Sequence, residues 1–133
     1  MASPAQALKH RVLIVDDEET TRVVLAGMVS AELKAEVQLA GTCEQALRFA
    51  ETQRYDAILL DLMMPGIGGF ALLHRVRRSA PNAATPVLIV SADKQAAERC
   101  LSAGASACLV KPVKAAELGK LIRRHLGAPP KKP

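Results

Sequence analysis

The sequence predicts an α/β fold in which a parallel β-sheet is covered by helices on both faces. Five short runs rich in Val, Ile, Leu and Ala recur along the chain, and each is followed by turn residues and a longer stretch with helical spacing. Runs 12–15 and 87–90 are apolar without alternation, which is typical of strands buried on both faces. The 133 residues, half of them hydrophobic, suit one doubly wound domain with one core.

The expected strands are the β-branched or leucine-rich runs, namely 11–15, 36–40, 57–60, 86–90 and 107–110. Helices are expected where apolar residues recur at three- and four-residue spacing. These helices are 19–33, 44–52, 69–79, 94–103 and 115–126.

The helices differ in the apolar surface that they offer to the core. The expected inner side of helix 19–33 holds Val24, Leu25 and Met28. The inner side of helix 115–126 holds Leu118, Leu121, Ile122 and Leu126. The inner side of helix 94–103 holds only Ala97, Cys100 and Leu101. Because small side chains bury little apolar area, we expect helix 94–103 to be the least firmly held.

The two ends of the chain are expected to lie outside the folded part. We predict a flexible segment over 1–10, one domain over 11–127 and a Pro/Lys-rich tail over 128–133. Segment 1–10 lacks the apolar stretch of a signal peptide, and no apolar run approaches a membrane span. We therefore expect a cytoplasmic protein with no membrane partner, and the three cysteines are interpreted as small hydrophobic residues in a reducing compartment.

The net charge of +5 makes nucleic acid a partner to consider, because clustered Lys and Arg release counterions from phosphate. The basic residues are scattered, however, and aromatic residues make up only 2% of the chain, which leaves few rings on which bases could stack. We expect no nucleic-acid partner and interpret the basic side chains as solvated helix faces. The histidines, His10, His74 and His125, are interpreted as surface residues.

Polar side chains follow four of the expected strands, at the point where each strand ends. They are Asp16 and Asp17, then Asp61, Ser91 and Lys111. In an open parallel sheet these carboxyl ends share one edge, and ligands bind there. Each residue alone could cap a helix or start a turn. Together, three acids, a hydroxyl group and a lysine at one edge indicate a functional site.

Three carboxylates placed together repel, by roughly 4 kcal/mol for two unit charges about 4 Å apart at an effective dielectric of about 20. A positive group must therefore lie among them. Lys111 can balance part of the charge, and an all-oxygen cleft is the setting in which Mg²⁺ is completed by a phosphate group. Zinc is disfavoured because neither His nor Cys stands at these positions. With Mg²⁺ bound, Asp61, alone at the central strand, is the expected nucleophile toward phosphorus.

Other α/β functions fit the sequence less well. The run Asp16-Asp17-Glu18-Glu19 would repel a dinucleotide or flavin phosphate at the first turn, and no P-loop pattern is present. A Mg²⁺-dependent phosphohydrolase using Asp61 needs a second acid two residues later as general acid/base, where this chain has Met63. A binding module that never uses its site is the third alternative.

The motifs at these positions resemble the receiver domains of two-component response regulators over about residues 11–126. The motifs are Val-Leu-Ile-Val-Asp-Asp-Glu at 12–18, Leu-Leu-Asp-Leu-Met-Met-Pro-Gly at 59–66, Val-Ser-Ala at 90–92 and Leu-Val-Lys-Pro at 109–112. The resemblance implies a flavodoxin-like sheet with strand order 2-1-3-4-5, and a signalling domain over 11–127 that is not an enzyme acting on external substrates.

The resemblance also implies roles for individual residues. Asp61 would be the phosphoacceptor and a Mg²⁺ ligand. Asp17 would ligate Mg²⁺ directly, Asp16 largely through water, and Met63 through its main-chain carbonyl. Ser91 and Lys111 would each contact a phosphoryl oxygen, and the peptide bond from Lys111 to Pro112 would be cis.

The implied partners are a phosphohistidine donor, on a sensor histidine kinase or histidine phosphotransfer protein, and a downstream target protein. Whether the chain is an adaptor or an intermediate carrier of a phosphorelay stays open. One departure concerns switching, because Cys108 stands where the family usually has Tyr or Phe, three residues before the lysine. We expect instead that Ser91 moves toward the phosphate and displaces the loop that leads into helix 94–103.

Overall fold

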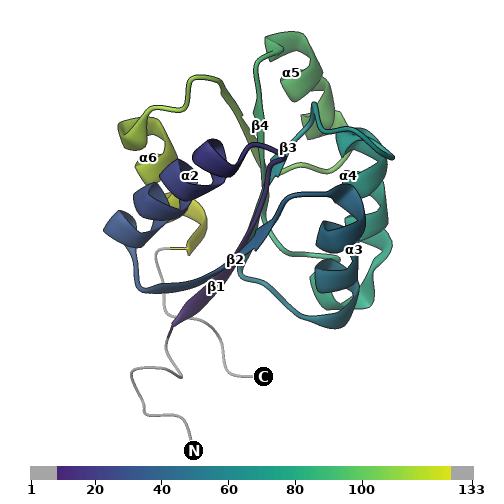
Figure 1. The fold of residues 1–133 in the computed structure, drawn as a ribbon, viewed down its shortest axis with the longest axis horizontal. Helices are drawn as coiled ribbons and strands as arrows, with labels where there is room; N and C mark the ends of the chain where they lie inside the picture. Colours follow the sequence, from purple (N-terminus) through teal and green to yellow (C-terminus); the bar gives the residue numbers. More distant parts are fainter. Residues whose placement is uncertain (1–8, 127–133) are drawn as a thin grey trace, which may run out of the picture.

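A computed structural model describes residues 9–126, which form a five-stranded parallel sheet with helices on both faces (Figure 1). The strands are β1 (His10–Val15), β2 (Ala35–Ala40), β3 (Ala57–Asp61), β4 (Val87–Ser91) and β5 (Ala107–Val110). Their order in the sheet is β2-β1-β3-β4-β5, and all neighbouring strands run parallel. The predicted fold class and strand order are confirmed.

The helices divide between the two faces of the sheet. They are α2 (Glu19–Glu32), α3 (Cys43–Thr52), α4 (Gly69–Arg78), α5 (Lys94–Ser102) and α6 (Ala115–Leu126), with a 3₁₀ turn η1 (Ala80–Asn82) after α4. Figure 1 shows α2 and α6 on one face and α3, α4 and α5 on the other. Every predicted boundary lies within one residue of the observed one.

The sheet separates two hydrophobic cores because successive side chains of a strand point to opposite faces. Leu13 and Val15 of β1 pack under α3, α4 and α5, whereas Val12 and Ile14 pack under α2 and α6. The central strand β3 is buried along its whole length and ends at Asp61, which is 4% exposed. An acidic side chain thus ends a fully buried central strand, at the edge where ligands of such sheets bind.

Two predicted core positions are wrong. Val24 is 48% exposed, because the buried face of α2 passes through Leu25 and Val29 and a neighbouring residue is turned by about 100°. Leu101 is 45% exposed, and Ala96 takes its place beside Ala97 and Cys100 as the inner side of α5. Helix α5 therefore contacts the core through small side chains.

His10 also departs from its prediction, since it is 8% exposed rather than at the surface. It begins β1, where its N–H donates to the carbonyl of Lys34 at 3.1 Å, so the strand carries it into the sheet. The predicted terminal segments fall almost entirely outside the described residues. Within 9–126, no helix combines the length and apolarity needed to cross a bilayer.

One arginine ties the far end of α5 to the chain before β4. Arg77 of α4 donates from Nε to the carbonyl of Gly104 at 2.9 Å and from Nη1 to the carbonyl of Thr85 at 2.7 Å. The same nitrogen Nη1 also lies 3.3 Å from the carbonyl of Asn82. Because these acceptors belong to two separate loops, a single guanidinium group fixes the turn after α5 against the connection from α4 to β4.

Candidate functional site

Three acids meet at the carboxyl edge of the sheet. One carboxylate oxygen from each of Asp16, Asp17 and Asp61 lies within 4.8 Å of the other two. Asp16 follows β1 and is completely buried, Asp61 ends β3, and Asp17 is exposed. The cluster therefore has a buried floor and one carboxylate open to solvent.

Lys111 connects two of these acids. Its Nζ lies 3.2 Å from Oδ2 of Asp16 and 3.3 Å from Oδ2 of Asp61, and its side chain is 25% exposed. Burial acts to lower the pKa of Lys111, but the charges of Asp61 and Asp16 outweigh it and raise the pKa above its ordinary value. The lysine thus stays charged, and three carboxylates with one ammonium group leave an excess of negative charge.

The environment of Asp61 disfavours its charged form. Burial raises the pKa of Asp61 above its ordinary value, and the charge of Asp16 adds to this effect. The N–H of Met63, which donates to Oδ1 of Asp61 at 3.0 Å, and the charge of Lys111 act in the opposite direction. Each oxygen of this carboxylate therefore has a donor, one on the main chain and one on Lys111.

Asp16 is held by contacts from the end of β2, from Glu18 and from α2. Its N–H donates to the carbonyl of Ala40 at 3.1 Å, and its Oδ1 accepts from the N–H of Glu18 at 2.9 Å. Its carbonyl accepts from Nη1 of Arg22 at 2.7 Å. Arg22 was not among the predicted site residues. Its position in the sequence, four residues after the residue that precedes α2, gave no indication of this contact.

Ser91 ends β4, the neighbour of β3, and is completely buried. Its Oγ accepts a hydrogen bond from the N–H of Asp93 at 3.1 Å, and Oδ1 of Asp93 accepts from the N–H of Ala96 to cap α5. Among the described residues, Ser91 makes no hydrogen bond through its hydroxyl to the acids or to Lys111. The structure places Ser91 at the predicted edge and connects it to the start of α5.

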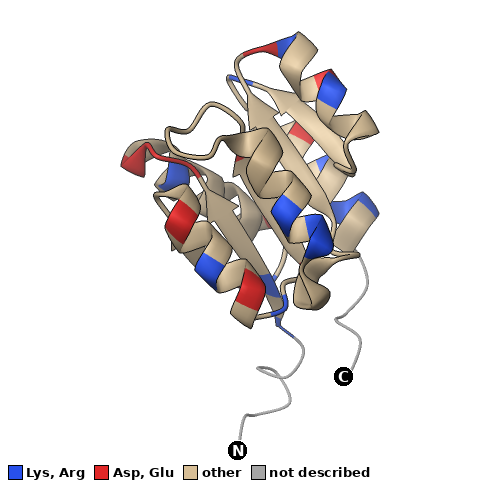
Figure 2. Cartoon of the chain, turned by 90° about the vertical axis from the view of Figure 1, so that its right-hand side faces the viewer, with Lys and Arg blue, Asp and Glu red and all other residues tan. Residues whose placement is uncertain are grey.

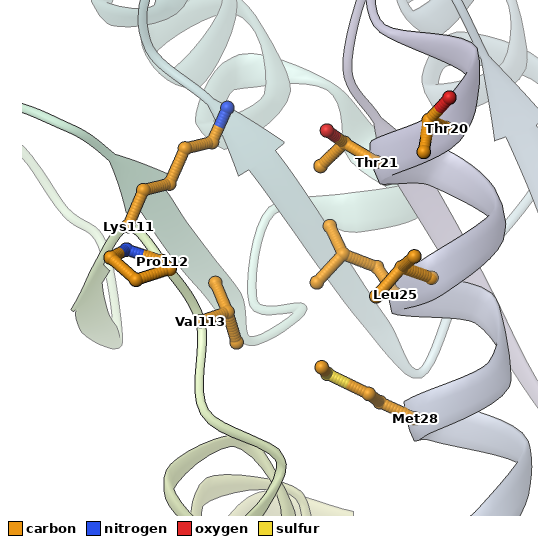
Figure 3. A pocket seen from close by; sticks show the side chains of 8 residues that line it. Thr20, Thr21, Leu25, Met28, Lys111, Pro112 and Val113 are labelled. Atoms are coloured by element: carbon orange, nitrogen blue, oxygen red, sulfur yellow. The ribbon is translucent and has the colours of Figure 1, made fainter.

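An apolar groove of about 480 Å³ opens beside the acidic cluster. It is lined by Thr20, Thr21, Val24, Leu25, Met28, Lys111, Pro112 and Val113. Figure 3 shows α2 on one side and the segment after β5 on the other, with Lys111 at one end. The bond from Lys111 to Pro112 is cis, as expected. The groove explains why Val24 is exposed: it lines a surface hollow rather than the core.

The charged residues are distributed as the sequence indicated. Figure 2 shows a run of acidic residues on one loop and further acidic residues on helices, and Lys and Arg are spread over several helices in this view. The atoms of the acidic cluster that could bind a metal are all carboxylate oxygens, which suit Mg²⁺ better than zinc. The cluster could therefore hold a hard divalent cation, with the open side at Asp17 left for water or a phosphate oxygen.

The sequence matches the family model described as "Response regulator receiver domain" over residues 12–123. The chain is 37% identical over 118 residues to the sensory/regulatory protein RpfC of Xanthomonas campestris pv. campestris, a match over 86% of the chain and 16% of RpfC. It is 38% identical over 119 residues to the transcriptional activator protein IrlR of Burkholderia pseudomallei, over 87% of the chain and 50% of that protein. The chain thus spans half or less of these relatives.

Solved structures agree in fold and length. The receiver domain of the sensor histidine kinase PA1611 from Pseudomonas aeruginosa PAO1 has a TM-score of 0.81 and 32% identity, covering 90% of this chain and 99% of that one. Its structure holds a magnesium ion coordinated in the active site cleft. The chemotaxis protein CheY4 of Vibrio cholerae has a TM-score of 0.80 and 29% identity, covering 89% and 99%. The fold, the acidic edge of the sheet and the match over residues 12–123 together show that the chain belongs to the response regulator receiver domain family of two-component signalling.

Proposed function

We propose that the chain is a phosphorylation-dependent signalling domain that accepts a phosphoryl group on Asp61. The observation that supports this most directly is the position of the Asp61 carboxylate at the end of the central strand, beside two further acids and 3.3 Å from Nζ of Lys111. This arrangement offers a nucleophile and a charge partner in one place. The domain would extend over 11–127, and the protein would be cytoplasmic.

In the proposed reaction an oxygen of Asp61 attacks the phosphorus of a phosphohistidine. The new O–P bond forms as the P–N bond breaks, and the leaving imidazole nitrogen keeps the electron pair and takes a proton from solvent. Asp16, Asp17, Asp61 and the carbonyl of Met63 would hold Mg²⁺, which when bound neutralises charge on the phosphoryl oxygens. Lys111 would pair with one phosphoryl oxygen, and the hydroxyl of Ser91 would donate to another.

The donor would be a sensor histidine kinase or a histidine phosphotransfer protein. The groove between α2 and the segment after β5 supports this part of the proposal, because it is apolar and has Lys111 at one end. An apolar helix face laid along it would bring a side chain of the donor to the acidic cluster. The exposed Val24 would then be covered by the partner.

Phosphorylation would change the partner-binding face through the start of α5. The hydroxyl of Ser91 is engaged by the N–H of Asp93, the residue that caps α5. If this hydroxyl turns toward a phosphoryl oxygen, the N–H of Asp93 loses its partner and the loop must rearrange. Because α5 is held by small side chains, it would shift easily with the loop, and a downstream target protein would recognise its altered position. The alternative role is that of a phosphorelay carrier, which would pass the phosphoryl group on.

The test is intact-mass measurement after treatment with Mg²⁺ and a small acyl phosphate. Asp56 precedes β3 and Asp61 ends it, so Asp56→Asn is a control at the opposite end of the same strand. The parent and Asp56→Asn should gain one phosphoryl group, and Asp61→Asn should gain none. Chelation of Mg²⁺ should abolish labelling of the parent. Equal labelling of Asp61→Asn and the parent would overturn the assignment of the acceptor.

A further inference from the structure

The peptide group between Asp16 and Asp17 is held by a side chain from outside the acidic cluster. Nη1 of Arg22 donates to the carbonyl oxygen of Asp16 at 2.7 Å. Within residues 9–126 no carboxylate lies within ion-pair distance of this guanidinium group. Within these residues its hydrogen-bond partner is a main-chain carbonyl, so the contact orients the backbone rather than balancing a neighbouring charge.

The end of β2 is shaped to accommodate this guanidinium group. A Cβ atom at Gly41 would lie 2.9 Å from Nη1 and 3.4 Å from Cζ of Arg22, which is closer than such atoms normally approach. The N–H of Gly41 donates to Oε1 of Gln45 at 2.9 Å, which fixes this loop against the start of α3. Arg22 therefore lies between the loop after β1 and the loop after β2, with a glycine at the close approach.

The direction of the Asp17 carboxylate depends on the contact from Arg22 more than the directions of the Asp16 and Asp61 carboxylates do. The carboxylate of Asp16 has donors in Glu18 and Lys111, and the carboxylate of Asp61 has donors in Met63 and Lys111. Among the described residues, none donates a hydrogen bond to the exposed carboxylate of Asp17. Its direction is therefore set by its backbone.

The peptide bond is planar, so a carbonyl held in place also fixes the next N–H and Cα. The hydrogen bond from Arg22 to the carbonyl of Asp16 thus fixes the plane from which the side chain of Asp17 departs.

We propose that Arg22 is a positioning residue of the divalent-cation site, which aims the Asp17 carboxylate through the Asp16–Asp17 peptide plane. This inference rests on the proposed function, in which Asp17 is a direct Mg²⁺ ligand. Charge and geometry make opposite predictions for Arg22. As a cation near the cluster, it would repel Mg²⁺, so its removal should tighten binding; as a positioning residue, its removal should weaken binding.

Calorimetric titration of the unphosphorylated protein with Mg²⁺ separates these roles. Arg22→Met should bind Mg²⁺ about tenfold more weakly than the parent, the lower part of the range for outer partners of metal ligands. Gly41→Ala should also weaken binding, because its Cβ displaces the guanidinium group while leaving the charge in the protein. Arg22→Lys keeps one donor and should recover part of the affinity. Arg48→Met removes an exposed arginine of α3 whose side chain makes no hydrogen bond or ion pair within residues 9–126, and it should bind Mg²⁺ as the parent does.

Urea unfolding with and without Mg²⁺ completes the test. A merely structural role of Arg22 would lower stability equally in both conditions, whereas a positioning role reduces the gain in stability that Mg²⁺ provides. Unchanged or tighter Mg²⁺ binding by Arg22→Met, in a parent that binds Mg²⁺ and is phosphorylated on Asp61, overturns this inference alone. A parent that binds no Mg²⁺ overturns the proposed function and this inference together.

Discussion

Replacement of Lys111 by Met should destabilise the protein strongly when Mg²⁺ is absent. The Nζ of Lys111 lies 3.2 Å from Asp16 and 3.3 Å from Asp61, and each pair attracts by about 5 kcal/mol at an effective dielectric of about 20. Desolvation offsets much of this attraction, and removal of one partner from a buried ion pair costs about 3–5 kcal/mol. Because the side chain of Lys111 is 25% exposed, we expect a loss near 3 kcal/mol.

Urea unfolding measures this loss directly. A loss of about 3 kcal/mol lowers the midpoint by roughly 1.5 M for a slope near 2 kcal/mol/M. Saturating Mg²⁺ should stabilise Lys111→Met more than it stabilises the parent, because a bound cation replaces the missing positive charge. Lys114→Met removes an exposed lysine without a carboxylate partner in the described region and should change little. Equal midpoints for Lys111→Met and Lys114→Met would refute the reasoning.

Three further outcomes are expected. Tyr55 is the only tyrosine and its burial raises the pKa of its phenol; the unfolded chain therefore ionises first, and stability should fall as pH rises from about 10 through the folded pKa. An absorbance titration that finds an ordinary folded pKa would contradict this. A Cβ at Gly69 would lie 2.5 Å from Cα of Leu62, so Gly69→Ala should lower the free energy of unfolding by about 2 kcal/mol. Gly27 lies in open space on α2, so Gly27→Ala should raise the free energy of unfolding by about 0.5–1 kcal/mol. Thermal unfolding that finds both variants stabilised, or both destabilised, would disprove the steric argument. The buried side-chain amide of Asn82 donates to two main-chain carbonyls and accepts a hydrogen bond from one main-chain N–H. Asn82→Ala should therefore lower the free energy of unfolding in urea by about 3 kcal/mol. A decrease below about 1 kcal/mol would contradict this role of Asn82.

The fold was predictable because local and global signals agree in this chain. Apolar runs without alternation, such as 87–90, indicate strands covered on both faces, and amphipathic stretches between them supply the covering helices. The parallel arrangement then places the residues after each strand at one edge. That rule was sufficient to bring Asp16, Asp61 and Lys111 together from positions up to 95 residues apart.

Sequence patterns did not determine which neighbouring face of a helix is buried. Val24 and Leu101 fit the apolar spacing of their helices as well as their neighbours do, and only packing turned them outward. The contact from Arg22 to Asp16 was also beyond reach of the sequence. It requires that Gly41, at the end of another strand, leave room for the guanidinium group. Such a contact has no periodicity, because its partners come from three separate segments.

The bonds of Arg77 determine the kind of motion that α5 can make. They anchor Gly104, just beyond the end of the helix, whereas at its other end the capping residue Asp93 donates its N–H to the hydroxyl of Ser91, at the edge of the sheet that holds the acidic cluster. A displacement that begins at Ser91 would therefore rotate α5 about its C-terminal end, near Gly104. In such a displacement the first turn, which begins at Lys94, would move furthest, and the last turn would keep its contacts with β5.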